Sequence, residues 1–314
     1  MLDLLYMEIL AFLLIAFVIF IVYTVKRKKY EKTEYFAQTH HAYRKLRGDK
    51  GLLGEYCIYT YLKPLKGHKR FLFNCYLPKE DGETTEVDVI LLHESGIYVF
   101  ESKNYSGWIF GTESKPYWTQ TLPKKRGRSQ KSSFLNPIIQ NKVHLKWLHT
   151  FLQEDTLHFY SFIVFSDRCT LKEINLTSDE HRVVNRYNLL AEVTRISQEM
   201  AAQLSVDKID DLYEKLYPLT QADAALKATH IENIQKKYSA SPSVDKGEKR
   251  CPRCGGKLVL RTASHGSRAG KPFWGCSNYP KCKYVQNMEA YFTYAKSGKN
   301  SSRCCKVVLF SGNC

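Results

Sequence analysis

Acidic residues are scarce in this 314-residue chain, where 31 Asp and Glu stand against 47 Lys and Arg and leave a formal net charge of +16. The deficit favours an anionic partner, either nucleic acid or the acidic face of a membrane, although a basic soluble protein without such a partner remains an alternative on charge alone. A hydrophobic content of 44% excludes a disordered chain. The length leaves room for one medium domain with accessory segments.

A disulfide framework is also missing. The chain has ten cysteines, but they are not spread along it as paired bridges would be. Four of them, Cys251, Cys254, Cys276 and Cys282, fall in one short region with the spacing of metal ligands. This pattern indicates a reducing compartment.

Charge is absent from Ile9–Val25, which as a helix would be about 26 Å long at ~1.5 Å per residue. With its apolar flank, residues 4–25 approach the span of a bilayer core. No small-x-small cleavage site follows the run, Asp3 and Glu8 precede it, and four basic residues follow it, which is the reverse of a signal peptide. We therefore expect a single-pass anchor in the cell membrane with the bulk of the chain cytoplasmic. A cleaved signal peptide and a buried helix are the alternatives.

Residues 86–104 form the central motif of the sequence, because they carry the main candidate site residues. Glu86–Leu92 and Ile97–Lys103 are rich in β-branched and aliphatic residues and predict the two arms of a β-hairpin. Asp88 lies on the first arm, and Glu101 and Lys103 share a face at the end of the second. Charges in such apolar strands are costly unless they are paired or hold a metal. Two carboxylates can bind a hard divalent cation, and a neighbouring lysine can orient water or stabilise charge on a phosphate. A strand-edge acid and a cross-face ion pair are the structural alternatives.

This arrangement resembles the Asp…(Asp/Glu)-x-Lys signature of the large nuclease fold that includes many restriction endonucleases. Roughly residues 49–160 also resemble the nuclease-related domain (NERD) family through a series of short motifs in the same order. These motifs are Gly51-Leu-Leu-Gly-Glu55, Glu86-Val-Asp-Val-Ile90, Gly96-Ile-Tyr-Val-Phe-Glu-Ser-Lys-Asn104, Gly107-Trp-Ile-Phe-Gly111, Trp118-Thr-Gln120 and Asn136-Pro-Ile-Ile-Gln140.

The resemblance implies a restriction-endonuclease-like α/β fold, in which helices flank a mixed sheet. It also implies that Asp88 and Glu101 hold Mg²⁺ or Mn²⁺, that Lys103 positions or activates water, that Glu55 lies close to the metal and that Gln140 faces the site. Taken alone, a Glu at position 55 fits the first turn of a helix. His144 shares a helix face with Gln140, four residues earlier, but alone it is better interpreted as a hydrogen-bonded helix histidine than as a ligand.

Residues 115–131 contain no acid and are densest in positive charge at Lys124, Lys125, Arg126 and Arg128. We interpret them as a loop that contacts the backbone of a nucleic acid, with a solvated loop as the alternative. Tyr117 and Trp118 could stack on bases, but as sheet-covering aromatics they fit a core better.

Near the C-terminus, Cys251-Pro-Arg-Cys254 and Cys276–Cys282 predict a four-sulfur structural zinc site. A domain of about 35 residues would need that metal to fold. The phrases around these cysteines resemble the C-terminal C4 zinc finger of bacterial type I topoisomerases, which binds single-stranded DNA. The resemblance implies that the aromatic Phe273, Trp274 and Tyr279, among basic residues, stack on bases; a zinc module that binds protein is the alternative.

The sequence thus predicts a transmembrane helix (4–25), a juxtamembrane segment (26–48) that contacts anionic lipid or is a solvated spacer, a nuclease-related domain (49–165) and a helical extension (166–238). A linker (239–250), a C4 zinc finger (251–286) and an unassigned tail (287–314) follow. The expected function is that of a membrane-anchored DNA nuclease for processing or repair, in which the zinc finger delivers single-stranded DNA. The alternative is a non-catalytic protein that tethers DNA to the membrane, and RNA is a weaker candidate substrate.

Overall fold

The computed structural model describes residues 2–124, 129–200, 202–240, 251–262 and 272–287, and its contacts divide the chain into two compact units, residues 1–236 and 237–314. The first elements in chain order are α1 (Leu2–Glu31), α2 (Glu34–Thr39), α3 (Tyr43–Gly48), α4 (Lys50–Leu62), β1 (Lys69–Pro78), β2 (Thr84–His93) and β3 (Gly96–Lys103). Next come β4 (Gly107–Thr112), β5 (Tyr117–Pro123), β6 (Ser129–Leu135), α5 (Pro137–Leu152), β7 (Phe159–Phe165), β8 (Cys169–Asn175) and β9 (His181–Asn185). The last are α6 (Arg186–Glu199), α7 (Val206–Leu216), the 3₁₀ turn η1 (Tyr217–Thr220), α8 (Ala224–Ala240), β10 (Leu258–Thr262), β11 (Pro272–Cys276) and β12 (Val285–Asn287).

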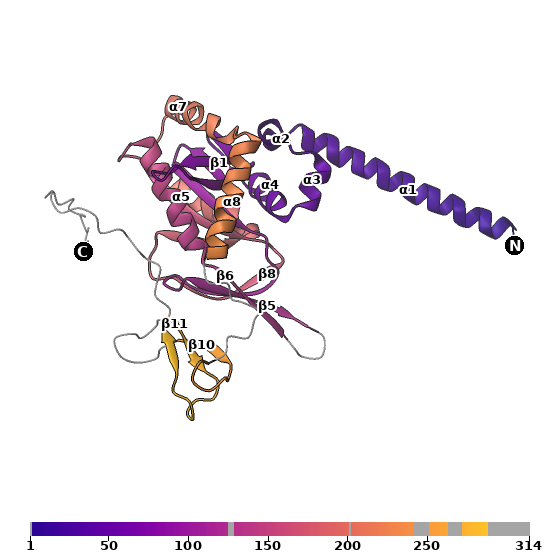
Figure 1. Ribbon diagram of the computed structural model, residues 1–314. Helices are drawn as coiled ribbons and strands as arrows, with labels where there is room; N and C mark the ends of the chain where they lie inside the picture. The colour runs from indigo at the N-terminus through magenta and orange to yellow at the C-terminus, as the bar shows by residue number, and fades with distance from the viewer. Residues whose placement is uncertain (1, 125–128, 201, 241–250, 263–271, 288–314) are drawn as a thin grey trace. The chain divides into compact units, whose positions relative to one another are not determined.

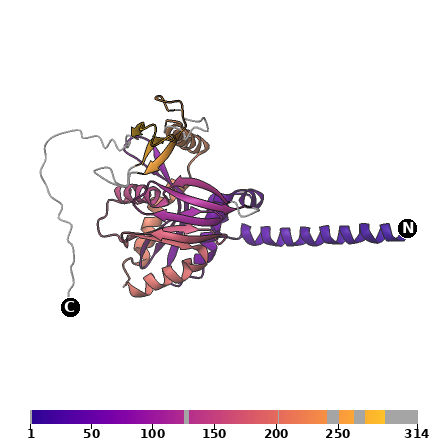
Figure 2. The same cartoon turned by 90° about the horizontal axis from the view of Figure 1, so that it is seen from below.

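The larger sheet has the strand order β1-β2-β3-β7-β9. Strands β1, β2 and β3 pair antiparallel, so the predicted hairpin is confirmed, and β3, β7 and β9 pair parallel. Helices cover both faces of this sheet (Figures 1 and 2). Tyr98 and Phe100 pack in the core on the α4 and α6 face, whereas Ile97 and Val99 pack in the core on the α5 and α7 face, because side chains alternate along a strand. The mixed α/β fold expected from the sequence is confirmed.

A second sheet, with the order β6-β5-β4-β8, was not expected from the sequence. The prediction of a loop over residues 115–131 is wrong for most of that range, which forms the hairpin of β5 and β6. Trp118 is buried and stacks on Phe165 at 6.1 Å between ring centroids, so it belongs to the core. Gly111 faces this indole, and a Cβ at position 111 would lie 2.3 Å from it.

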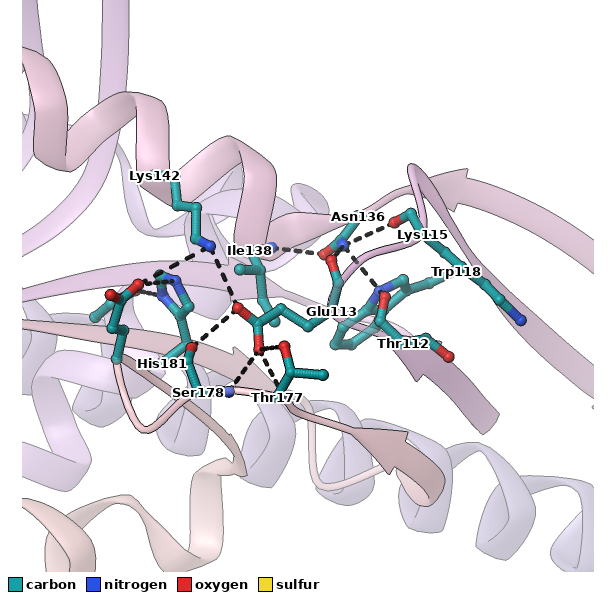
Figure 3. Close-up of polar contacts among 12 residues, drawn as sticks. Thr112, Glu113, Lys115, Trp118, Asn136, Ile138, Lys142, Thr177, Ser178 and His181 are labelled. Carbon is teal, nitrogen blue, oxygen red and sulfur yellow. Dashed lines mark hydrogen bonds and ion pairs between the residues drawn. The ribbon is translucent and has the colours of Figure 1, made fainter. Parts of the chain in front are cut away.

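A buried network ties the end of β4 to the start of α5 and to the segment between β8 and β9 (Figure 3). Both carboxylate oxygens of Glu113 accept hydrogen bonds, from the backbone N–H and hydroxyl groups of Thr177 and Ser178 and from Lys142. Asn136 caps α5 by accepting from the N–H of Ile138, and its Nδ2 donates to the carbonyls of residues 113 and 115 at 2.8 Å. The first turns of α5, which carry Gln140, are thereby fixed to the second sheet.

The predicted helical extension, residues 166–238, begins with strands β8 and β9, and its last part forms α7, then η1 with Pro218 in its first turn, and then α8. Pro218 lacks the backbone N–H that a continuing helix would need. At the other end of the unit, Tyr6–Glu31 of α1 is long and apolar enough to cross a membrane, with a mean hydropathy of 2.7 in its most apolar window. A signal sequence or a core helix can share this length and composition.

Candidate functional site

Asp88 lies where the regular pairing of the larger sheet is interrupted. The β1–β2 pairing skips Asn74 and Asp88, and the β2–β3 pairing ends at Val89 opposite Phe100. Val87 packs in the core on the α5 face, whereas Val89 packs in the core on the α4 face, so the expected alternation shifts at Asp88. An irregularity of this kind re-aims a side chain next to a functional site, and here it places Asp88 between groups from both faces.

Three carboxylates influence one another at this point. Asp88 Oδ2 accepts a hydrogen bond from the backbone N–H of Ser102 at 2.7 Å. Burial first, and then the charges of Glu101 and Glu55, raise the pKa of Asp88 well above its usual value, although Lys103 opposes this shift. A carboxyl group in such surroundings needs a proton or a cation to balance its charge.

Glu101 is the most enclosed of the site carboxylates, with 1% of its surface exposed. Its Oε1 lies 2.5 Å from Lys103 Nζ and its Oε2 lies 3.0 Å from His144 Nε2. Burial alone would raise the pKa of Glu101, but Lys103 and His144 outweigh it and lower the pKa. Burial likewise works to lower the pKa of Lys103, yet the charges of Glu101 and Asp88 raise it. The Lys103 ammonium also donates to Gln140 Oε1 at 3.0 Å, so the Glu101–Lys103 pair is ionised and held in one geometry.

His144 is a site residue that sequence reasoning assigned to the helix alone. It is buried, and its second ring nitrogen, Nδ1, shares a hydrogen bond of 2.8 Å with the hydroxyl of Thr85. An ionised carboxylate only accepts hydrogen bonds, so Nε2–H donates to Glu101 and the ring orients that carboxylate. Its position four residues after Gln140, on the same helix face, was the one indication in the sequence that His144 belongs to the site. The sequence of α5 does not show that its partner is Glu101 in β3.

Glu55 reaches the site from α4 because that helix lies against the end of β3. A Cβ at Gly54 would lie 2.3 Å from Ser102 Oγ, so glycine allows this close approach without a shift of the Ser102 hydroxyl. Glu55 is buried at 6% exposure, and its Oε2 accepts from Asn74 Nδ2 at 2.9 Å. Asn74 turns inward with a φ of 51°, a left-handed conformation that Asn tolerates better than most residues. Burial is the main reason that the pKa of Glu55 is raised to about 8.

The structure therefore brings together all five residues predicted to be catalytic, namely Glu55, Asp88, Glu101, Lys103 and Gln140. Their donor set of carboxylate oxygens suits a hard divalent cation, and Mg²⁺ needs only one or two carboxylates beside water and phosphate oxygens. The neighbouring carboxylates that raise the pKa of Asp88 fit the same cation, because a bound cation would favour the ionised form of Asp88. Glu55, Asp88 and Glu101 are not drawn together as a closed cage, because within the described residues only the four cysteines form a group of three or more potential ligands within 4.8 Å.

The second unit is built around those four cysteines. Sγ atoms lie 3.7 Å apart for Cys251 and Cys282 and 3.4 Å apart for Cys254 and Cys276, distances typical of sulfurs that share one tetrahedral metal. The first knuckle closes with Gly255 at a φ of 68°, which allows its N–H to donate to the Cys251 carbonyl. Strands β10, β11 and β12 form a three-stranded antiparallel sheet beside the cluster. The four cysteines fit the predicted zinc site.

The aromatic residues of this unit differ in exposure. Tyr279 is 60% exposed, and Arg261 lies over its ring at 5.8 Å from the centroid. Phe273 and Trp274 are half-buried, and Trp274 packs against the cysteine cluster. Of the predicted basic loop, Lys124 is exposed, and Lys125, Arg126 and Arg128 lie outside the described residues.

Comparison with known sequences bears on both units. The sequence model of the nuclease-related domain matches residues 50–166, and that of the topoisomerase DNA-binding C4 zinc finger matches residues 248–291. An uncharacterized protein of Bacillus anthracis is 33% identical over 191 residues, which cover 60% of this chain and 86% of that protein. The chain belongs to the nuclease-related domain family.

The NERD region, residues 50–166, contains all five predicted catalytic residues. It also contains His144 and the hairpin that carries Asp88 and Glu101. Two further relatives match shorter stretches of the chain. DNA topoisomerase 1 of Archaeoglobus fulgidus is 30% identical over 162 residues, covering 50% of this chain and 21% of that enzyme. The YrdD protein of Escherichia coli is 48% identical over 40 residues, 13% of this chain and 19% of that protein. No solved structure matches the chain.

Proposed function

We propose that the chain is a divalent-metal-dependent nuclease that hydrolyses phosphodiester bonds in DNA. The observation that carries this proposal is the placement of the half-buried Asp88 and the buried Glu101 beside Lys103 at the point where β2 and β3 separate. Charged groups with perturbed pKa values, brought together by irregular backbone, are typical of catalytic sites. Membership of the NERD family supports the reaction class.

Each residue would have a distinct part in the reaction. Asp88 and Glu101 would hold Mg²⁺ or Mn²⁺, which when bound polarises a phosphate and acidifies a coordinated water. Lys103 would orient the attacking water or balance charge on the phosphate. Gln140 keeps the Lys103 ammonium in place, and His144 keeps Glu101 in place through its second oxygen.

The other parts of the chain would bring the substrate and the site to one location. The C4 zinc finger would bind single-stranded DNA, with the exposed Tyr279 as its stacking residue. Zinc there would be structural, because four sulfur ligands leave no open position. Helix α1 would anchor the chain in the cell membrane with residues 26–314 on the cytoplasmic side, which agrees with the positive charge after the apolar run.

The test uses the full chain, purified in detergent with zinc, and single-stranded and duplex DNA with Mg²⁺, Mn²⁺ or EDTA. We expect cleavage that needs the divalent ion and that Glu101→Gln and Lys103→Ala abolish. Glu180→Gln is the matched control, because Glu180 is 72% exposed and lies outside the site. Tight DNA binding without cleavage under any metal would refute the nuclease and favour a DNA tether.

A further inference from the structure

A residue outside the NERD region reaches into its site. The Tyr35 hydroxyl, on α2, lies 3.1 Å from Glu55 Oε2 and 3.3 Å from the Leu52 carbonyl oxygen. The carboxylate is the closer and the stronger acceptor, so the hydroxyl proton is donated mainly to Glu55. Tyr35 is fully buried, and its ring packs edge-on against Phe73 and Tyr56 at 4.7 and 5.5 Å between centroids. The solvated-spacer interpretation of residues 26–48 is therefore wrong for this part of the segment, which is built into the core of the first unit.

The contact has the geometry of a positioning interaction. Both donors to Glu55, Tyr35 and Asn74, contact Oε2, and within the described residues Oε1 carries no hydrogen bond. One oxygen of the carboxylate is thus fixed from the protein side, and the other is left for a ligand. The burial that raises the pKa of Glu55 to about 8 is opposed by these two hydrogen bonds, so they favour the ionised form that a cation would bind.

The position of Tyr35 depends in turn on the end of α1. Tyr30 is 1% exposed, and its ring lies 6.3 Å from that of Tyr35 and 5.3 Å from that of Tyr56. The turn from α1 to α2 is closed by Thr33, whose hydroxyl donates to the Tyr30 carbonyl and whose oxygen accepts from the N–H of Phe36. The ring contacts and this capped turn hold Tyr35 against α4.

We propose that the segment preceding the NERD region completes the nuclease site, with Tyr35 as the positioning residue that aims Glu55 at the metal held by Asp88 and Glu101. This inference rests on the proposed function for the identity of the site, and it adds a component that the family match, which begins at residue 50, does not include. It assigns the segment a role in cation binding.

The test measures Mn²⁺ binding to the zinc-loaded full chain in detergent by electron paramagnetic resonance of the free ion, with DNA cleavage as a separate readout. Tyr35→Phe removes one hydroxyl and should weaken Mn²⁺ binding about tenfold, because a hydrogen bond to a charged group is worth about that factor. Tyr30→Phe is the matched control, since its hydroxyl donates to the His41 carbonyl, and it should change binding less than twofold.

A double-mutant cycle separates positioning from general loosening. If Tyr35 acts through Glu55, then Tyr35→Phe should have no further effect in a Glu55→Gln background. An equal loss in both backgrounds, or Mn²⁺ binding that Glu101→Gln leaves unchanged, would overturn the inference. Absence of cleavage by the wild type, with the Mn²⁺ result intact, would remove the nuclease reaction and leave the role of Tyr35 standing.

Discussion

Glu113 offers the most direct test of how the second sheet is held to the rest of the first unit. Hydrogen bonds, the largest of them from the backbone N–H of Thr177, lower the pKa of Glu113 from 4.5 to about 2. The substitution Glu113→Gln keeps the size of the side chain but removes the charge. Both oxygens of Glu113 accept hydrogen bonds (Figure 3), and the substitution replaces one of them by an N–H₂ group that cannot accept.

The expected cost follows from the separate contacts. The ion pair with Lys142 contributes little, about 1 kcal/mol or less, because the lysine is 46% exposed. The hydrogen bonds from Thr177 and Ser178 to a buried charge contribute more, and losing the charge should cost about 2 kcal/mol in all. For a unit of this size that corresponds to a fall of roughly 4–8 °C in Tm.

The sign of the pH dependence is fixed by the direction of the shift. The folded pKa lies below the unfolded one, so the stabilisation is fully present above about pH 5 and declines as the pH falls through 4.5 towards 2. Thermal unfolding of the full chain in detergent, followed by tryptophan fluorescence from pH 3 to 7, should show wild type and Glu113→Gln converging at the acid end.

Glu180→Gln is the control, because Glu180 also approaches Lys142 but is 72% exposed, and it should change Tm by less than about 2 °C. A Glu113→Gln loss no larger than that of Glu180→Gln would refute the reasoning. So would a difference between wild type and variant that stays constant down to pH 3.

Three further outcomes follow from the structure. Gly111→Ala should destabilise the first unit by about 3 kcal/mol, because the new Cβ would lie 2.3 Å from the Trp118 ring. Gly48→Ala is the control and should not destabilise it, because Gly48 has open space around it. Equal Tm values of the two variants in thermal unfolding would contradict this prediction. His144→Ala should lower DNA cleavage roughly 10- to 100-fold by freeing Glu101 on one side, while DNA binding in a mobility-shift assay stays unchanged; wild-type cleavage would exclude the histidine from the site. Removing zinc with a chelator should unfold the C-terminal unit alone, seen as faster hydrogen exchange there, and unchanged exchange would count against a structural metal.

The hairpin and its charged residues could be predicted because their signal is local. Alternating apolar residues, a short turn and three charges in an apolar context predict both the strands and a site. Their approach to Gln140 could be expected only from the family resemblance, since β4, β5 and β6 lie between β3 and α5 in the sequence.

No local sequence pattern indicated the second sheet or the contacts between distant residues that build the site. Residues of β6 are largely exposed and polar, so they lack the hydrophobic pattern that identifies a strand. The shift of side-chain alternation at Asp88 lies opposite Asn74, where the β1–β2 pairing is interrupted, and the sequence alone does not predict the left-handed φ of Asn74. Tyr35 and His144 contact residues far from them in the chain, and neither local pattern nor composition predicts such contacts.

Helix α1 continues without a break from its apolar part to Tyr30, which is buried in the folded unit. A continuous helix transmits a change in its tilt or rotation to the residues at its end, as a flexible tether would not. In the membrane placement proposed above, a thinner or thicker bilayer would change the inclination of α1, and the lever would turn α2 with it. A change in bilayer thickness would then alter the position of the Tyr35 hydroxyl and, through its hydrogen bond, the position of the Glu55 carboxylate.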